Sequence, residues 1–224
     1  MDAPVYNTFY VLDLDRTLFD TIKATELMRG IIALHDTELA ARLEQRFEEF
    51  SISGESFSMR DFIAESVNDE EMVQIETKYK QIALDWNLLN PGASELVEYL
   101  RSQPDVGFGI LTYGSELGQK MKIEAVPLLK DIPFLVTPET YKGAQLASWR
   151  QDDDLYHLPD ELGRGVTKQL VLVDDKPFSF KGLPIDCRGY LVKSVFDAGI
   201  EKIPSTVVAV DNLDAVIAAE KNIA

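Results

Sequence analysis

The sequence predicts an α/β fold in which a Rossmann-like parallel sheet is flanked by helices and carries a smaller, all-helical insertion. Two observations predict this fold. Short apolar runs alternate with helix-compatible stretches along most of the chain, and one long segment near the N-terminus interrupts that alternation with helical periodicity alone. The composition agrees, because 224 residues that are 46% hydrophobic and 27% charged are typical of a soluble globular protein.

The expected strands are short, rich in β-branched or aromatic residues, and mostly apolar on both faces, as suits a parallel sheet covered on both sides. We expect strands at residues 8–14, 107–112, 134–137, 170–173, 189–192 and 206–210. Helix-compatible stretches lie between them, and the first follows Asn90-Pro91, which is a helix-start signal. We expect helices at residues 92–101, 115–125, 141–150 and 211–222. This alternation predicts a doubly wound sheet.

The segment between the first expected strand and Asn90 has no convincing strand. Its apolar residues recur at helical spacing, as Ile22, Leu27 and Ile31 illustrate, so it predicts an insertion of about four helices. The predicted domains are an α/β core formed by residues 1–20 and 91–224 and a helical domain formed by residues 21–90.

The charge and cysteine content exclude several functions. The net charge is −16, and the chain has no lysine or arginine cluster, which argues against nucleic acid or an anionic membrane surface as a partner. The single cysteine, Cys187, excludes an internal disulfide framework. The chain has no signal-like N-terminus and no apolar run long enough to span a membrane. These features together lead us to expect a cytoplasmic protein.

The strongest functional signal is a pair of aspartates, Asp13 and Asp15, at the end of the first expected strand. Two carboxylates placed so close together repel each other unless a cation or a proton is shared between them. Open α/β sheets bind ligands at this edge, so the pair predicts a divalent metal and an acid/base role. The alternative interpretation is a strand end with two solvated aspartates.

A second acidic pair, Asp174-Asp175, repeats this pattern behind the apolar run at residues 170–173. If the two strands are neighbours, their ends form an oxygen-rich site for a hard cation, and Mg²⁺ is the default. A third strand ends at Thr112, followed by a turn glycine and a helix, where a hydroxyl and backbone N–H groups can hold a phosphate. That turn taken alone is a weak signal, because it often serves only as a helix cap.

These residues together resemble the motifs of the haloacid dehalogenase superfamily. The first motif, Asp-x-Asp-x-Thr, is matched by Asp13, Asp15 and Thr17. The second, an apolar strand that ends in Ser or Thr, is matched at Thr112, and the acidic fourth motif at Asp174-Asp175. The match spans residues 9 to 180 in the right order and spacing.

The third motif of that family is a lysine, for which the sequence offers two candidates. Lys142 opens the helix after the strand at residues 134–137, from which it can reach across the ligand-binding edge of the sheet. Lys168 lies at the opposite end of the following strand from the carboxylates. We favour Lys142, although it lies unusually far along the chain from Asp174. Arg16 stands where the family often has glycine, and the sequence leaves open whether it contacts substrate or points to solvent.

The resemblance implies a phosphatase mechanism. Asp13 would be the nucleophile that forms an aspartyl-phosphate, and Mg²⁺ would be held by Asp13, the backbone carbonyl of Asp15 and Asp174. Asp15 would act as the general acid and then the general base, and the dehalogenating relatives lack this second aspartate.

The remaining motif residues have implied roles at the phosphate. Thr112 and Lys142 would hold the phosphoryl oxygens, and Asp175 would support the metal or bind it through water. The helical domain corresponds to the family's cap, and its net charge of −7 favours a small, weakly charged phosphorylated metabolite over a polyphosphate. Two alternatives stay open, a sugar phosphomutase with the same site and a non-catalytic binding or regulatory protein of this fold.

Overall fold

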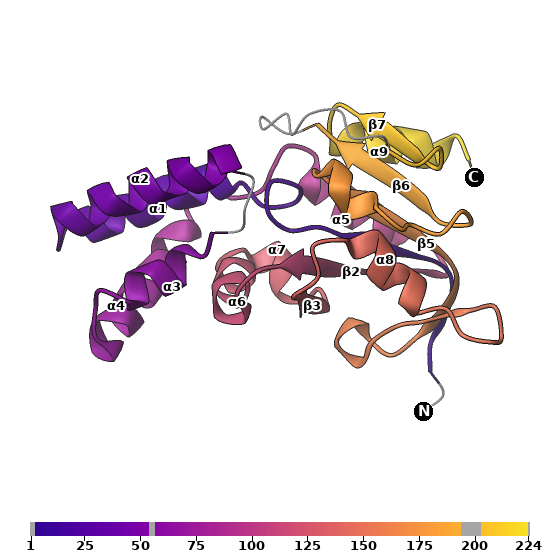
Figure 1. The fold of residues 1–224 in the computed structure, drawn as a ribbon, viewed down its shortest axis with the longest axis horizontal. Coiled ribbons are helices and arrows are strands. Elements are labelled where there is room, and N and C mark those ends of the chain that lie inside the picture. The colour runs from indigo at the N-terminus through magenta and orange to yellow at the C-terminus, as the bar shows by residue number, and fades with distance from the viewer. Residues whose placement is uncertain (1–2, 54–56, 194–202, 224) are drawn as a thin grey trace. The chain divides into compact units, whose positions relative to one another are not determined.

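A computed structural model describes residues 3–53, 57–193 and 203–223 of the chain. The chain divides into two compact units (Figure 1). One unit contains the sheet, and the other contains most of the helices that follow the first strand. The sheet unit comprises Met1–Leu18, Asn90–Thr112 and Ile132–Ala224, and the helical unit comprises Phe19–Leu89 and Tyr113–Asp131.

The sheet has the strand order β3-β2-β1-β5-β6-β7. Its strands are β1 (Val5–Leu12), β2 (Val106–Tyr113), β3 (Phe134–Thr137), β5 (Val166–Asp174), β6 (Arg188–Val192) and β7 (Val207–Val210), and the short β4 (Tyr156–His157) pairs with β5 in the antiparallel sense. The pairs that β1 makes with β2 and β5 are parallel, as are those of β6 with β5 and β7. After β1 the chain builds outward on one side, and from β5 on the other, so the topological switch lies between β1 and β5.

Helices of the sheet unit cover both faces of the sheet. They are α5 (Ala93–Ser102), α8 (Lys142–Ser148) and α9 (Leu213–Lys221), with 3₁₀ turns η1 (Asp160–Leu162) and η2 (Pro177–Phe180). Phe9 of β1 lies in one apolar cluster with Leu146 of α8, whereas the next residue, Tyr10, lies beside Glu220 of α9. Because successive side chains of a strand point to opposite faces, α8 and α9 cover different faces of the sheet.

The helical unit contains the four helices expected in the insertion, together with two short helices from beyond β2. They are α1 (Thr21–Ala33), α2 (Thr37–Ser53), α3 (Met59–Ala64), α4 (Asp69–Ala83), α6 (Glu116–Ala125) and α7 (Pro127–Lys130). Within this unit α1 packs on α2 and α4, and α6 packs on α3 and α4. These helices bury apolar side chains, among them Met28 of α1, Ile63 of α3 and Tyr79 of α4, so burial of apolar surface stabilises the unit.

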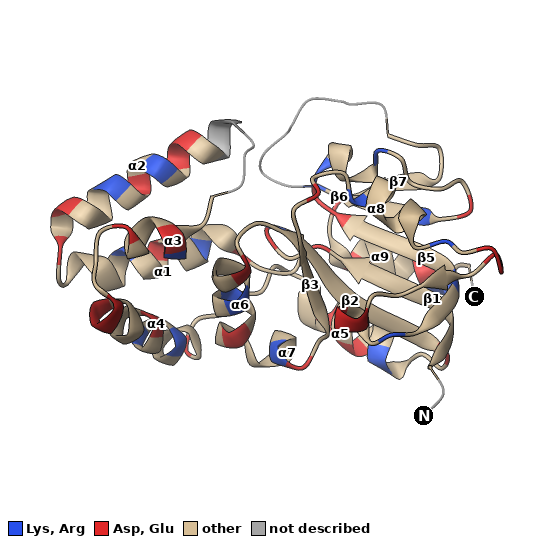
Figure 2. Ribbon diagram, turned by 60° about the horizontal axis from the view of Figure 1, so that its bottom comes forward, with Lys and Arg blue, Asp and Glu red and all other residues tan. Residues whose placement is uncertain are grey.

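Local charges and caps stabilise these helices. Asn68 and Glu71 form a reciprocal capping box at the start of α4, where the first turn is acidic and favours the positive end of the helix dipole. Figure 2 shows acidic and basic residues interleaved along α2. Arg46 and Glu49 form one such ion pair on that helix, with N–O distance 2.9 Å. Within the described part of the chain, every helix is too short or too polar to cross a lipid bilayer.

The fold class predicted from the sequence is confirmed, and the differences are local. β1 begins at Val5 rather than Thr8. The prediction missed its first residues because they alternate between exposed and half-buried and so lack a continuous apolar run. β5 likewise begins four residues earlier than expected. The two-residue β4, the one-turn α7 and both 3₁₀ turns were not predicted, since such short elements carry no periodic pattern.

Candidate active site

The two central strands bring the two acidic motifs together. Leu12 and Val173 are paired in the parallel register of β1 and β5, so the residues that follow them leave the sheet at the same level. The N–H of Asp13 donates to the carbonyl of Val173 at 2.9 Å, which fixes the start of the first acidic loop on the neighbouring strand. Asp13 and Asp174 therefore stand side by side at the carboxyl edge of the sheet.

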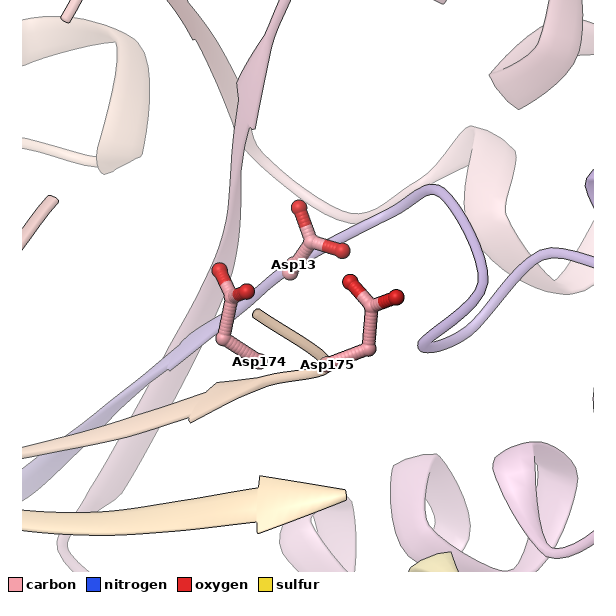
Figure 3. Close-up of side chains that lie close together, drawn as sticks. All are labelled: Asp13, Asp174 and Asp175. Carbon is pink, nitrogen blue, oxygen red and sulfur yellow. The ribbon is translucent and has the colours of Figure 1, made fainter. Parts of the chain in front are cut away.

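Three carboxylates gather at this edge (Figure 3). One oxygen from each of Asp13, Asp174 and Asp175 lies within 4.8 Å of the others, and all three side chains are buried. Burial, with the nearby Asp174 and Asp15 carboxylates and against the opposing effect of Lys142, raises the pKa of Asp13 to about 6. Burial and the charges of Asp13 and Asp174 raise the pKa of Asp175 to about 7. The cluster is therefore electrostatically costly when it is fully ionised.

Lys142 bridges two of these carboxylates. Its Nζ contacts Asp13 Oδ1 and lies 2.7 Å from Asp174 Oδ2, and the lysine is only 3% exposed. Burial alone would lower the pKa of Lys142, but the two carboxylates raise it above its usual value, so the amine stays cationic. Lys142 is the first residue of α8 and precedes Asp174 by 32 residues. Between them the chain returns to the sheet through β4 and β5, which brings the two side chains into contact.

The support of Asp174 comes from the turn that follows β5. The hydroxyl of Ser179 and the backbone N–H of Lys176 both donate to Asp174 Oδ1 at 2.8 Å. This turn also packs closely on α8, because a Cβ added to Gly143 would lie 2.7 Å from the backbone nitrogen of Leu183. The helix that carries Lys142 therefore lies directly against the segment that supports Asp174.

The far end of the loop after β1 is held by Asn90. The side-chain N–H of Asn90 donates to the carbonyl of Thr17 at 3.0 Å, and its backbone N–H donates to the carbonyl of Leu18 at 2.9 Å. Within the loop, Arg16 has a positive φ of 66°, and its Nε lies 3.3 Å from Asp175 Oδ2. The Arg16 side chain therefore points toward the acidic cluster.

The chemistry of these groups fits a small divalent cation. Carboxylate oxygens are the ligands that Mg²⁺ prefers, and three of them converge here. Asp175 Oδ1 is buried and has no hydrogen-bond partner among the residues that the structure describes, so this oxygen has unused lone pairs. A divalent cation at this position would satisfy that oxygen and offset the repulsion between the carboxylates.

The other predicted residues take distinct places. Thr112 is buried on β2, next to β1, and so lies at the same edge of the sheet. Asp15 is half-buried, raises the pKa of Asp13, and lies outside the three-carboxylate cluster. Lys168 is exposed near the start of β5 and remote from that cluster along the strand.

Sequence reasoning did not single out Ser179 as a partner of Asp174. Its hydroxyl reaches Asp174 only because η2 turns the chain back toward the end of β5. A serine four residues after an acidic pair carries no recognisable spacing signal. The ion pair of Arg16 with Asp175 was equally invisible, since it joins two loops that are distant in the chain.

The fold resembles solved structures over nearly its whole length. A protein from Burkholderia xenovorans LB400, described as a haloacid dehalogenase-like hydrolase, is 18% identical with a TM-score of 0.62 over 95% of this chain and 98% of that one. YfnB of Bacillus subtilis, a HAD hydrolase whose structure holds magnesium, is 14% identical with a TM-score of 0.53, and the coverages are 96% and 98%. CbbY of Rhodobacter sphaeroides, solved with phosphate, is 13% identical with a TM-score of 0.54, and the coverages are 93% and 95%.

Comparison of the sequence alone gives no such match: no protein-family model and no curated protein matches the chain. The structural likeness agrees with the order of the motifs, with the helical insertion between β1 and β2, and with the acidic cluster at the carboxyl edge. On this evidence the chain has the haloacid dehalogenase-like fold.

Proposed function

We propose that the protein is a Mg²⁺-dependent phosphatase that hydrolyses a small phosphorylated metabolite through an aspartyl-phosphate. The observation that carries the proposal is the buried cluster in which one oxygen from each of Asp13, Asp174 and Asp175 lies within 4.8 Å of the others, beside the cationic Lys142. A nucleophilic carboxylate, a set of hard oxygen ligands and a fixed cation are the groups that phosphoryl transfer requires. The magnesium and phosphate in structures of the same fold support the assignment.

The residues that would hold the metal are Asp13, Asp174 and the backbone carbonyl of Asp15, with Asp175 bound directly or through water. When bound, Mg²⁺ supplies positive charge that offsets the repulsion between the Asp13 carboxylate and the phosphate dianion. Lys142 would add to this charge from the protein side, because its amine stays cationic. Thr112 would donate its hydroxyl to a phosphoryl oxygen from the end of β2.

The proposed reaction has two balanced steps. In the first, an oxygen of Asp13 bonds to phosphorus, the bond from phosphorus to the leaving oxygen breaks, and Asp15 gives its proton to that oxygen. In the second, Asp15 takes a proton from water as the water oxygen bonds to phosphorus and the bond to Asp13 breaks. The products are the alcohol and inorganic phosphate, and both aspartates return to their starting states.

The helical insertion is the proposed cap of this enzyme. The proposed cap comprises residues 21–90, and the proposed core comprises residues 1–20 and 91–224. A cap excludes bulk water from the reacting groups and contacts the leaving group. The insertion carries 7 basic and 14 acidic residues, so we propose a leaving group of low negative charge.

The proposal is tested by phosphate release from an aryl phosphate and from a panel of phosphorylated metabolites, with Mg²⁺ or with a chelator. Turnover should require Mg²⁺, and Asp13→Asn should abolish it without altering the circular dichroism spectrum. The matched control is Asp152→Asn, the same chemical change at an exposed residue, which should keep full activity.

Other results of this experiment would favour the other candidate functions. Isomerisation of a sugar phosphate without release of phosphate would assign the site to a phosphomutase. Metal-independent binding of a phosphorylated metabolite, with neither release nor isomerisation, would point to a binding or regulatory protein. Full activity of Asp13→Asn would refute the assigned nucleophile.

A further inference from the structure

Arg16 adopts an unusual backbone conformation within the first acidic loop. Its φ of 66° lies in the left-handed region, which an L residue with a side chain adopts only at an energetic cost. The side chain is 17% exposed, and its Nε reaches Asp175 Oδ2, on a side chain that is 3% exposed. The fold therefore keeps a strained residue whose side chain points inward, toward an acidic cluster.

The two oxygens of Asp175 have different surroundings. Oδ2 is paired with Arg16, whereas Oδ1 is buried and lacks a hydrogen-bond partner within the described ranges. The nearby carboxylates of Asp13 and Asp174 oppose the negative charge of Asp175. Without a tether, this repulsion would rotate the Asp175 carboxylate away from its neighbours.

We propose that Arg16 is a positioning residue for the cation site, because it holds the Asp175 carboxylate with one oxygen turned toward Asp13 and Asp174. The inference rests on the proposed magnesium site and adds a residue to it. Arg16 acts through Asp175 and does not itself bind the metal, since a guanidinium has no lone pair to offer.

The proposal and a simple charge effect predict opposite changes in metal affinity when Arg16 is removed. A positive charge near a divalent cation repels it, so loss of Arg16 would tighten metal binding if charge were its only contribution. If Arg16 positions a ligand, its loss weakens metal binding instead. The Asp175 carboxylate then has to be brought back toward Asp13 and Asp174, against their repulsion, before it can bind the metal. Loss of a group that orients a metal ligand typically weakens affinity about 10- to 100-fold.

The test measures Mn²⁺ affinity of the metal-free protein by electron paramagnetic resonance, without substrate, and Mg²⁺ affinity by competition. We expect Arg16→Gly to weaken Mn²⁺ binding at least about tenfold. Glycine suits a positive φ, so the variant removes the side chain without adding backbone strain. Arg16→Lys is a second variant, which keeps the charge but not the Nε–H, and it should weaken binding in the same direction.

Arg164→Gly is the matched control. Arg164 also has a positive φ, of 50°, and its Nε lies 2.7 Å from Asp160 Oδ1, but both side chains are largely exposed, at the start of η1 and just after its end. The control removes the same residue type, the same kind of ion pair and the same backbone strain. Its Mn²⁺ affinity should equal that of the unmodified protein.

The outcomes separate the two proposals. Equal or tighter Mn²⁺ binding by Arg16→Gly, with normal binding by the unmodified protein, would overturn the role of Arg16 and leave the proposed function standing. If Arg16→Gly does not fold, the same criterion applies to Arg16→Lys. Absence of Mn²⁺ and Mg²⁺ binding by the unmodified protein would overturn the proposed metal dependence and the role of Arg16 with it.

Discussion

Replacing Asp175 with asparagine should stabilise the metal-free protein at neutral and alkaline pH. Asp175 is 7% exposed and lies with two other carboxylates in one buried cluster. Without a cation, its negative charge is opposed by burial and by its neighbours, while Arg16 offsets part of the cost. Asparagine is similar in shape and uncharged, so the substitution removes the repulsion and changes the packing little.

The magnitude follows from the pKa. Burial and the two neighbouring carboxylates raise the pKa of Asp175 from 3.8 to about 7 in the folded protein. A rise of that size corresponds to at most about 4 kcal/mol, present as stability below the unfolded pKa and lost as pH rises through the folded pKa. Because Asp13 titrates together with Asp175, and Arg16 loses its partner in the variant, we expect about half of this, roughly 2 kcal/mol.

The assay is urea unfolding of both proteins with a chelator at about pH 5, 6, 7 and 8. The variant should gain on the unmodified protein as pH rises across this range, and the gap should level off at its alkaline end. Added Mg²⁺ should stabilise the unmodified protein more than the variant, since the variant has lost a carboxylate at the proposed site. A variant that is less stable than the unmodified protein at every pH would refute the electrostatic reasoning.

Three further predictions concern the groups around the cluster and the far face of the sheet. Thr112→Val should lower kcat for phosphate release about tenfold or more while the melting temperature changes little, as steady-state kinetics and calorimetry would reveal. Gly143→Ala should destabilise the protein by about 1–3 kcal/mol in urea unfolding, because the added Cβ meets backbone atoms of residues 180–183. Glu220→Gln should cost about 3 kcal/mol in the same assay by leaving Arg188, its bidentate partner, poorly compensated, whereas activity per folded molecule should not change.

The parts of the fold that sequence predicts best are those with a repeating pattern. The buried halves of β1 and β5 are continuous apolar runs, and the helical insertion has apolar residues at regular spacing, so both could be recognised before the structure. The division into units could not be predicted fully. Helices α6 and α7 cluster with the insertion although they follow β2, and that choice depends on packing partners that a linear pattern does not contain.

In the candidate site, too, the residues on regular strands could be predicted and those brought in by irregular turns could not. Asp13 and Asp174 could be paired in advance, because each follows an apolar strand and parallel strands end at one edge of a sheet. The choice of Lys142 as the site lysine came from a family resemblance rather than from spacing, and its contacts with both carboxylates were not predicted. The Ser179 hydroxyl and the Arg16 guanidinium could not be placed, because short turns with no periodicity bring them to the carboxylates.

The cationic groups lower the electrostatic cost of burying three carboxylates together. Three buried carboxylates would repel one another strongly, but each lies beside a cation, since Lys142 contacts Asp13 and Asp174, and Arg16 pairs with Asp175. With all three carboxylates ionised, the two positive charges leave a net charge of about −1. The electrostatic cost is therefore smaller than that of three carboxylates without cations. A divalent cation can therefore be attracted by the residual charge without first having to hold the fold together.

The same reasoning predicts the behaviour of a double variant, Lys142→Met with Arg16→Gly. Without metal, this variant should be less stable than the unmodified protein, because both cations beside the carboxylates are gone. Mn²⁺ should restore more of its stability than KCl does at the same ionic strength, and urea unfolding with either salt would measure the difference.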